Sequence, residues 1–169
     1  VLPLVILPDP RLRAKAKKIR QIDDSVIKLA DDMVETMRYH NGVGLAANQV
    51  GVLKRIVVIE VPDDSLRVLV NPEIIKKNGE REVEEGCLSV PGYRGLVTRS
   101  IWVKARSLNI SGSEIRVKAD GLLAQALEHE IDHLNGIVYV DHLKSHEDLW
   151  KLEQELPLEI DQAESAQIS

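Results

Sequence analysis

The pentapeptide HEIDH, residues 129 to 133, places metal-binding residue types at helical spacing. Successive helical residues are about 100° apart, so His129 and His133 project from one face and can bind a single ion. Glu130 lies beside them, where a carboxylate can accept a proton from a metal-bound water without being a ligand, as in the hydrolytic H-E-x-x-H signature. The same string also arises on ordinary exposed helices, so a catalytic interpretation requires a third ligand.

Two residues could supply that ligand, and they predict different enzymes. Cys87, the only cysteine, lies in EEGCLSVPG, where Gly86 permits unusual backbone angles and Pro91 ends a strand, so its thiolate could be held at a fixed bend. Glu153 lies 20 residues beyond His133 (153 − 133), a spacing typical of zinc peptidases with a glutamate ligand. A buried, inert thiol is the commoner state of a free cysteine, so the residues alone leave these alternatives open.

Three further features bear on the site. GVGLAANQVG, residues 42 to 51, has three glycines and two adjacent alanines around Gln49, so its backbone can approach a ligand and one amide side chain can project into the gap. His142 and His146 are also four apart, but Leu143 stands where the acid would be, which indicates a solvated or capping pair. Asp132 is interpreted equally as support for the ligands or as a surface acid.

The remaining sequence predicts the elements that must position these residues. Apolar residues recur at intervals of three and four up to Asn41, which predicts a helix that Asp23 or Asp24 caps. A second helix is expected from Asp120 to Leu134. A third is expected from Ser145, in a capping-box pattern with Asp148, to just before Pro157. Branched aliphatic residues predict strands at 55–61, 66–77, 81–86, 94–100, 101–110 and 114–119.

Two turns separate some of these strands. Asn78-Gly79 is the strongest short hairpin signal, and SGS at 111–113 predicts a second turn. The expected fold is therefore α+β, with mostly antiparallel sheets around a central helix that carries HEIDH, and with an N-terminal and a C-terminal helix. Residues 1–169 are expected to form a single domain, of which 157–169 is a mobile acidic tail.

Composition limits the expected partners. With 22 Lys and Arg against 27 Asp and Glu, the formal charge is -5, so DNA is not an expected partner, although a local basic patch stays open. No run of 18 apolar residues occurs, so no membrane span is expected. A single cysteine cannot form an internal disulfide and suits a reducing compartment. Phe is absent, so the core must consist of Leu, Ile and Val.

Together, GVGLAANQVG, EGCLSVPG and HEIDH resemble the three motifs of the peptide deformylase family, in that family's order. The resemblance extends to PDPRLR near the start and covers essentially residues 3 to 143. It implies hydrolysis of the N-terminal formyl group from formyl-methionyl nascent polypeptides, with release of formate. It further implies a cytoplasmic location and a transient encounter with ribosomes. The acidic tail differs from the basic C-terminal helix that would favour ribosomal RNA, so docking through that segment is not expected.

Carried over residue by residue, the resemblance implies a mononuclear metal site. Cys87, His129 and His133 would bind one divalent ion, with a water in the open fourth position as the nucleophile. Glu130 would act as the general base. Family members often use Fe²⁺, the native ion implied here, and also accept Zn²⁺, Ni²⁺ or Co²⁺, among which this ligand set does not itself choose.

The resemblance also assigns residues to the substrate. The Gln49 amide and the Leu88 N–H would donate to the developing oxyanion. The other assignments are Gly44 and Gly86 beside the peptide backbone, and Val43 and Leu122 in the pocket for the methionine side chain. The competing hypotheses are a zinc endopeptidase that uses Glu153 and a non-enzymatic metal site or interaction module, for which the chain offers no convincing fourth protein ligand.

Overall fold

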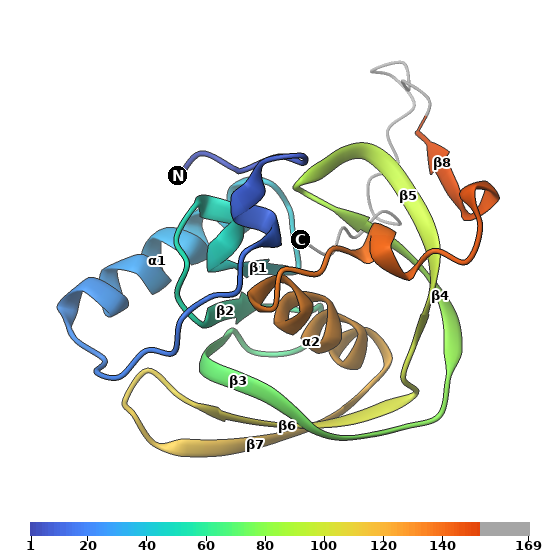
Figure 1. Cartoon of the computed structure of the whole chain (residues 1–169). Coiled ribbons are helices and arrows are strands. Elements are labelled where there is room, and N and C mark those ends of the chain that lie inside the picture. Colours follow the sequence, from blue (N-terminus) through green and yellow to red (C-terminus); the bar gives the residue numbers. More distant parts are fainter. Residues whose placement is uncertain (153–169) are drawn as a thin grey trace.

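Two antiparallel sheets surround helix α2 (Gly121–Leu134), the helix that carries HEIDH (Figure 1). The computed structural model describes residues 1–152. In spatial order, the larger sheet contains β1 (Gly44–Ala46), β2 (Ile56–Ile59), β3 (Arg67–Asn78), β6 (Trp102–Leu108) and β7 (Glu114–Asp120). The smaller sheet contains β4 (Arg81–Cys87), β5 (Val90–Arg99) and β8 (Leu149–Lys151). The predicted α+β fold with a central HEIDH helix is confirmed.

Helix α1 (Asp24–Tyr39) covers the side of the larger sheet that faces away from α2. Asp23 is its N-cap, and the Asp23 side chain accepts a hydrogen bond from the Val26 N–H, which satisfies one of the unpaired amides of the first turn. Met33 and Met37 on its apolar stripe are fully buried. The predicted helix and its cap are therefore confirmed.

Strand β2 shows why the middle of the larger sheet is apolar on both faces. Successive strand residues point to opposite faces, so Ile56 and Val58 pack in the cluster that includes α1, whereas Val57 and Ile59 pack in the cluster that includes α2. All four side chains are fully buried. A strand covered on both faces requires the continuous apolar run IVVI rather than an alternating pattern.

Short 3₁₀ turns connect the main elements. The N-terminal segment ties two of the connections together, because the Val5 N–H donates to the Gln49 carbonyl at 2.7 Å and the Leu7 N–H donates to the Ser89 carbonyl at 3.0 Å. The loops that contain Gln49 and Ser89 are thus fixed relative to each other. The four turns are η1 (Pro10–Arg13), η2 (Ala47–Val50), η3 (Tyr139–His142) and η4 (His146–Asp148).

The hairpin predicted at Asn78-Gly79 is wrong, although the chain does bend there. Gly79 adopts a positive φ of 72°, but β3 pairs with β6 and β4 pairs with β5, so the bend carries the chain from one sheet to the other. The local turn signal was sound, and the long-range pairing of β3 with β6 decided the topology. The turn predicted at residues 111–113 does join adjacent paired strands, with Gly112 at a φ of 84°.

The C-terminal helix predicted from Ser145 is also wrong in its described part. The Ser145 hydroxyl accepts a hydrogen bond from the Glu147 N–H, as a cap would, but only the short turn η4 follows. Residues 149–151 then form strand β8 against the edge of β5. Pairing with an open strand edge outweighs the weak helical preference of a few residues. The rest of that helix and the predicted tail at 157–169 lie outside the described residues.

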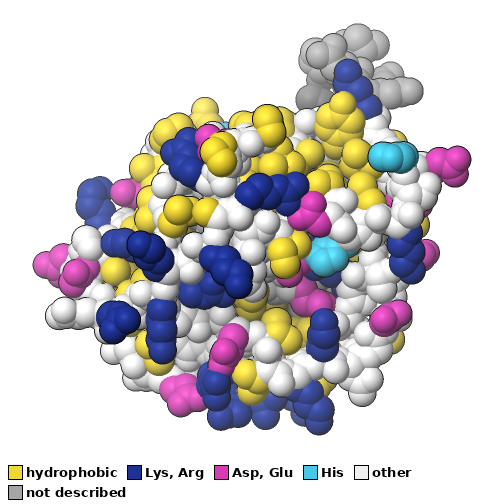
Figure 2. Space-filling view, in the orientation of Figure 1, with side chains coloured by type: hydrophobic (Ala, Val, Ile, Leu, Met, Phe, Trp, Pro, Cys, Tyr) yellow, Lys and Arg dark blue, Asp and Glu magenta, His cyan; other side chains and the backbone are white. Residues whose placement is uncertain are grey.

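The surface carries charge of both signs, with one uneven region. Figure 2 shows Lys and Arg side chains gathered along the lower border, where Figure 1 places β3, β6 and β7. Within residues 1–152, no helix combines the length and the apolar character needed to cross a membrane.

Candidate metal centre

Three side chains with metal-ligand chemistry converge in the interior. The Cys87 Sγ lies 3.4 Å from the His133 Nε2, and the two Nε2 atoms of His129 and His133 are 3.2 Å apart. All three ligand atoms lie within 4.8 Å of one another, and the three residues are buried. The structure thus brings together the three residues that the sequence analysis assigned to one ion.

Backbone geometry explains this convergence. Cys87 is the last residue of β4 and pairs with Val90 of β5, so a two-residue turn fixes the direction of its side chain. His129 and His133 lie one helical turn apart on the face of α2 that looks toward this turn. Gly136, with a positive φ of 77°, follows the helix and carries the chain away from the site.

The separations fit a single tetrahedral ion. With metal–sulfur and metal–nitrogen bonds of ordinary length, the ligand atoms of such a site are roughly 3.3–3.6 Å apart. The distance of 3.4 Å from the Cys87 Sγ to the His133 Nε2 lies within this range, and the distance of 3.2 Å between the two Nε2 atoms lies just below it. One thiolate and two imidazoles suit a borderline transition-metal ion such as Fe²⁺ or Zn²⁺ better than Mg²⁺ or Ca²⁺, which prefer oxygen ligands.

The protonation states of Cys87 and His133 in the metal-free protein are also those expected of an empty metal site. Burial raises the pKa of the Cys87 thiol, and burial lowers the pKa of His133 well below its ordinary value. Both groups are therefore neutral without an ion. A bound cation reverses the effect on the thiol, because a coordinated thiol is deprotonated.

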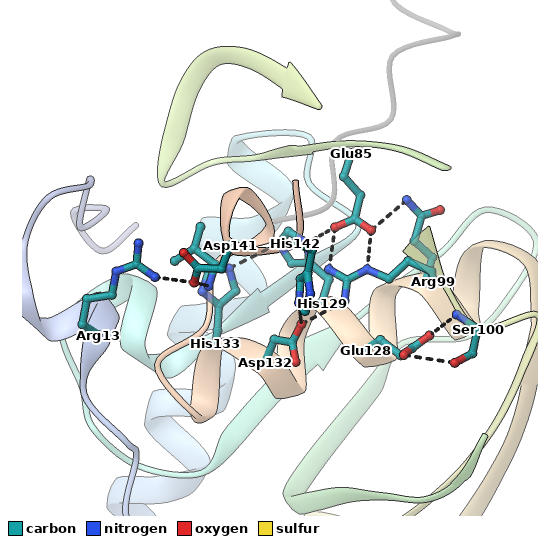
Figure 3. Close-up of polar contacts among 12 residues, drawn as sticks. Arg13, Glu85, Arg99, Ser100, Glu128, His129, Asp132, His133, Asp141 and His142 are labelled. Carbon is teal, nitrogen blue, oxygen red and sulfur yellow. Dashed lines mark hydrogen bonds and ion pairs between the residues drawn. The ribbon is translucent and has the colours of Figure 1, made fainter. Parts of the chain in front are cut away.

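A buried carboxylate that the sequence analysis missed orients His129. The Glu85 Oε1 accepts a hydrogen bond from the His129 Nδ1 at 2.7 Å (Figure 3). The Nε2 of His129 is thereby left for the group that it forms with His133 and Cys87. Such carboxylate–histidine pairs fix the ring and increase its basicity as a ligand. The alternating pattern of REVEEG predicted a strand, but nothing in it indicated that Glu85 would be the inward-facing acid.

Arg99 balances the charge of Glu85. Its Nε and Nη2 donate to the two oxygens of Glu85 at 2.6 and 2.8 Å, and its Nη1 donates to Asp132 at 2.9 Å (Figure 3). Burial alone would raise the pKa of Glu85, but the hydrogen bonds from Arg99 and His129 lower it below its ordinary value. Glu85 is therefore ionised while fully buried.

Asp132 has the supporting role that was one of its two interpretations. Besides Arg99, it accepts a hydrogen bond from the His142 Nε2 at 2.8 Å. His142 is half-exposed, so this chain of contacts runs from the His129 ring to the surface. His142 is therefore partly solvated, as expected, and its bond to Asp132 is a contact that the sequence analysis did not predict. His146 lies exposed in η4, as expected of a solvated residue.

Replacement of Arg99 tests the buried ion pair. Arg99→Gln leaves the Glu85 carboxylate without its main counter-charge, and we expect the free energy of unfolding of the metal-free protein to fall by about 3–5 kcal/mol. Urea unfolding followed by circular dichroism measures this. As a matched control, Arg38→Gln breaks the exposed pair with Glu60 and should change the free energy of unfolding far less, because solvent screens exposed ion pairs. Equal losses in the two variants would contradict the proposed charge balance.

Glu130 stands apart from this network. It is fully buried, and within the described residues neither of its carboxylate oxygens has a hydrogen-bond partner. Burial raises the pKa of its carboxyl well above the ordinary value, and the negative charge of Glu85 raises it further. A Cβ on Gly44 would lie only 2.5 Å from the Glu130 Oε2, so a larger residue at that position of β1 would displace the Glu130 carboxylate. A buried acid without partners is costly unless it serves a ligand or a reaction.

Gln49 reaches the sulfur from the opposite loop. Its Nε2 lies 3.6 Å from the Cys87 Sγ and donates to the Ser89 hydroxyl at 3.2 Å, while its Oε1 accepts from the Ala46 N–H at 3.0 Å. The amide is thus oriented with its NH₂ group toward the candidate ligands. Leu88, also buried, follows Cys87 in the turn between β4 and β5.

The other predicted substrate residues lie around this centre. Gly44 is in β1 and Gly86 in β4, and each of these strands is at the edge of its sheet. Buried Val43 and partly buried Leu122 belong to one apolar cluster. Glu153, the rival ligand, lies outside the described residues.

This constellation is typical of mononuclear metal-dependent hydrolases, and comparison with known proteins narrows the class. A family profile described as polypeptide deformylase matches residues 1–148. A peptide deformylase of Dehalococcoides mccartyi is 53% identical over 157 residues, covering 91% of this chain and 94% of the relative. The chain belongs to the polypeptide deformylase family.

Solved structures agree with this assignment. A peptide deformylase from Legionella pneumophila superposes with a TM-score of 0.83 at 44% identity, covering 85% of this chain and 86% of that one. One from Ehrlichia chaffeensis, in complex with actinonin, gives a TM-score of 0.85 at 41% identity, with coverage of 88% and 91%. The chain is accordingly an enzyme, a metal-dependent hydrolase that removes the N-formyl group from nascent peptides.

Proposed function

We propose that deformylation takes place at the centre formed by Cys87, His129 and His133, with Glu130 as the general base. The observation that carries the proposal is the convergence of one sulfur and two ring nitrogens within 4.8 Å, beside a buried carboxylate that has no partner among the described residues. The three protein ligands leave room for an exchangeable position, as catalytic sites require.

The three ligands would hold one divalent ion, with Fe²⁺ as the native metal and Zn²⁺, Ni²⁺ or Co²⁺ as substitutes. When bound, such an ion acts as a Lewis acid that polarises a carbonyl oxygen and lowers the pKa of water to near neutrality. Glu85 keeps the Nε2 of His129 free to act as a ligand, because it occupies the Nδ1.

Glu130 is proposed to carry the proton through the reaction. Its carboxylate accepts a proton from the attacking water and then delivers it to the amine nitrogen as the bond to the formyl carbon breaks. Enclosure by Gly44 and the surrounding core keeps bulk water away from this proton. The positive charge of an ion beside it would oppose the effect of burial and favour the ionised base.

Two donors would stabilise the oxyanion that develops on the formyl oxygen. The Gln49 amide is already held by the Ala46 N–H on its carbonyl side, and its Nε2, which donates to the Ser89 hydroxyl in this structure, would turn a hydrogen toward the oxyanion. The Leu88 N–H lies in the rigid turn next to Cys87. Each such donor contributes on the order of 10²–10³ in turnover.

The peptide substrate would bind as an extended strand. Gly44 in β1 and Gly86 in β4 lie on strands with an open edge, and an extended peptide can add its backbone hydrogen bonds to such edges. Val43 and Leu122 would contact the methionine side chain from their shared apolar cluster. We further propose that the chain acts as one catalytic domain in the cytoplasm, where formylated chains are made.

An assay for formate tests the proposed function. Protein purified without oxygen should contain about one equivalent of divalent metal and release formate from a formyl-Met-Ala-Ser peptide, whereas chelator-treated protein should not. Readdition of Fe²⁺ at about 100 times its Kd should restore turnover and stabilise the fold by about 2.7 kcal/mol. Glu153→Gln should retain both metal and activity. Loss of metal in that variant would instead favour the endopeptidase hypothesis.

A further inference from the structure

The outer face of the larger sheet, turned away from α2, carries a row of three lysines. Lys76 of β3 lies directly opposite Lys104 of β6, and Lys104 lies opposite Lys118 of β7. Directly opposed residues project from the same face of a sheet. The next residues in register, Ala105 and Val117, are buried on the other face. We call Lys76, Lys104 and Lys118 the lysine row.

Within residues 1–152, no member of the lysine row forms an ion pair, although Asp120 lies two residues from Lys118 on the same face. Arg106 and Arg116, which lie opposite each other two residues along β6 and β7, differ from the lysine row. Arg106 pairs with Glu73, and Arg116 lies 3.6 Å from the nearest oxygen of Glu114. The positive charge on this face is therefore concentrated in the lysine row.

An aromatic ring lies among these charges. The Lys76 and Lys118 ammonium groups lie 5.8 and 5.3 Å from the centroid of the Trp102 ring, which is half-exposed on β6. Contacts of this kind hold lysine side chains over an aromatic face. A basic surface with an accessible aromatic ring is the combination that nucleic-acid backbones and bases recognise.

Ordinary surface requirements do not explain the lysine row. Lysine on an edge strand prevents unwanted strand pairing, and this role fits Lys118 on β7 and Lys76, which lies beyond the part of β3 that pairs with β2. It does not fit Lys104, because β6 is paired on both sides there. Like charges placed directly opposite each other destabilise a sheet. In a chain with a net charge of -5, three such residues in register require a compensating role, which an anionic partner supplies.

We propose that the lysine row and Trp102 bind the phosphate backbone of ribosomal RNA. Three ammonium groups on flexible stems, spread over roughly 10 Å across three strands, can each reach a separate phosphate. The choice of ribosomal RNA rests on the proposed function, because a formylated nascent chain is presented by the ribosome. The face lies opposite the one that packs on α2, so RNA there leaves the candidate metal centre open to the peptide.

Charge-matched variants test this proposal. Lys76→Gln/Lys104→Gln/Lys118→Gln and a control, Lys15→Gln/Lys28→Gln/Lys144→Gln, both change the net charge from -5 to -8, and the control residues are exposed and lie outside β3, β6 and β7. Binding to a ribosomal RNA hairpin is measured over a range of salt concentrations, and binding to vacant bacterial ribosomes is measured by co-sedimentation. The lysine-row variant should bind about tenfold or more weakly, with a logarithmic salt slope smaller by about two to three, whereas the control retains wild-type values.

Two results would overturn the proposal. One is an equal loss of RNA binding in the lysine-row variant and in the control, which would show that binding depends only on net charge. The other is competition by polyglutamate as effective as that by RNA of equal charge, which would indicate an acidic protein partner. Formate release from a soluble formyl-methionyl peptide should be unchanged in both variants. Failure of RNA binding is therefore distinguishable from failure of the proposed function.

Discussion

Cys87→Ser is expected to abolish tight metal binding and, with it, formate release. A serine hydroxyl stays protonated near neutral pH and is a far weaker ligand than a thiolate. Loss of a residue that merely orients a ligand costs about 10–100-fold in metal affinity, and loss of a ligand should exceed that. Metal content by atomic emission spectrometry and formate release from a formyl-methionyl peptide measure the two effects together.

The fold should survive this substitution. Cys87 is buried in the small cluster that also contains Val97 and Tyr139, and serine is slightly smaller, so the metal-free variant should show the same circular dichroism spectrum as the metal-free wild type. Ser89→Ala is a suitable control, because Ser89 contacts the Gln49 amide rather than the ion and should leave metal content unchanged. Turnover like that of the wild type in Cys87→Ser would disprove the assignment of Cys87 as a ligand.

Glu130→Gln is expected to separate metal binding from catalysis. The amide matches the carboxylate in size but cannot accept the proton, so turnover should fall on the order of 10²–10⁴-fold while the metal content stays near that of the wild type. The comparison is informative because Glu130 has no hydrogen bond to any described residue, and little else is disturbed by its replacement.

Kinetics with a series of formyl peptides would complete this test. Removal of a group that acts on the transferred proton lowers kcat and leaves KM nearly unchanged, whereas a purely structural effect would alter both and also the metal content. Asp132→Asn is the comparison on the same helix, because that side chain bonds Arg99 and His142 and should change stability more than kcat. Retention of normal kcat in Glu130→Gln would exclude it as the base.

Much of this fold could be predicted from local patterns. The helical spacing around Met33 and Met37 and a cap at Asp23 or Asp24 predicted α1, and the branched aliphatic residues at 55–61 predicted a strand there. HEIDH placed two imidazoles on one face by helical geometry alone. The third ligand and the substrate residues came from the resemblance of three motifs to a family, rather than from spacing.

The rest depended on contacts that no local pattern encodes. Glu85 and Glu84 are neighbours of the same type in β4, yet only Glu85 faces Arg99, 14 residues away, and His129, 44 residues away. Asn78-Gly79 has the composition of a hairpin, but the pairing of β3 with β6 placed it between sheets. The lysine row likewise becomes visible only when the register of three strands is known.

The position of α2 after seven of the strands has a consequence for biosynthesis. The strands of the larger sheet and β4 and β5 all precede residue 121, so they leave the ribosome before the helix that fills the space between them. Until α2 packs, the apolar concave surfaces stay open to water and are prone to aggregation. Metal loading must also wait for it, since two of the three candidate ligands come from α2. Maturation of this enzyme is therefore expected only after residues 121–134 have left the ribosome.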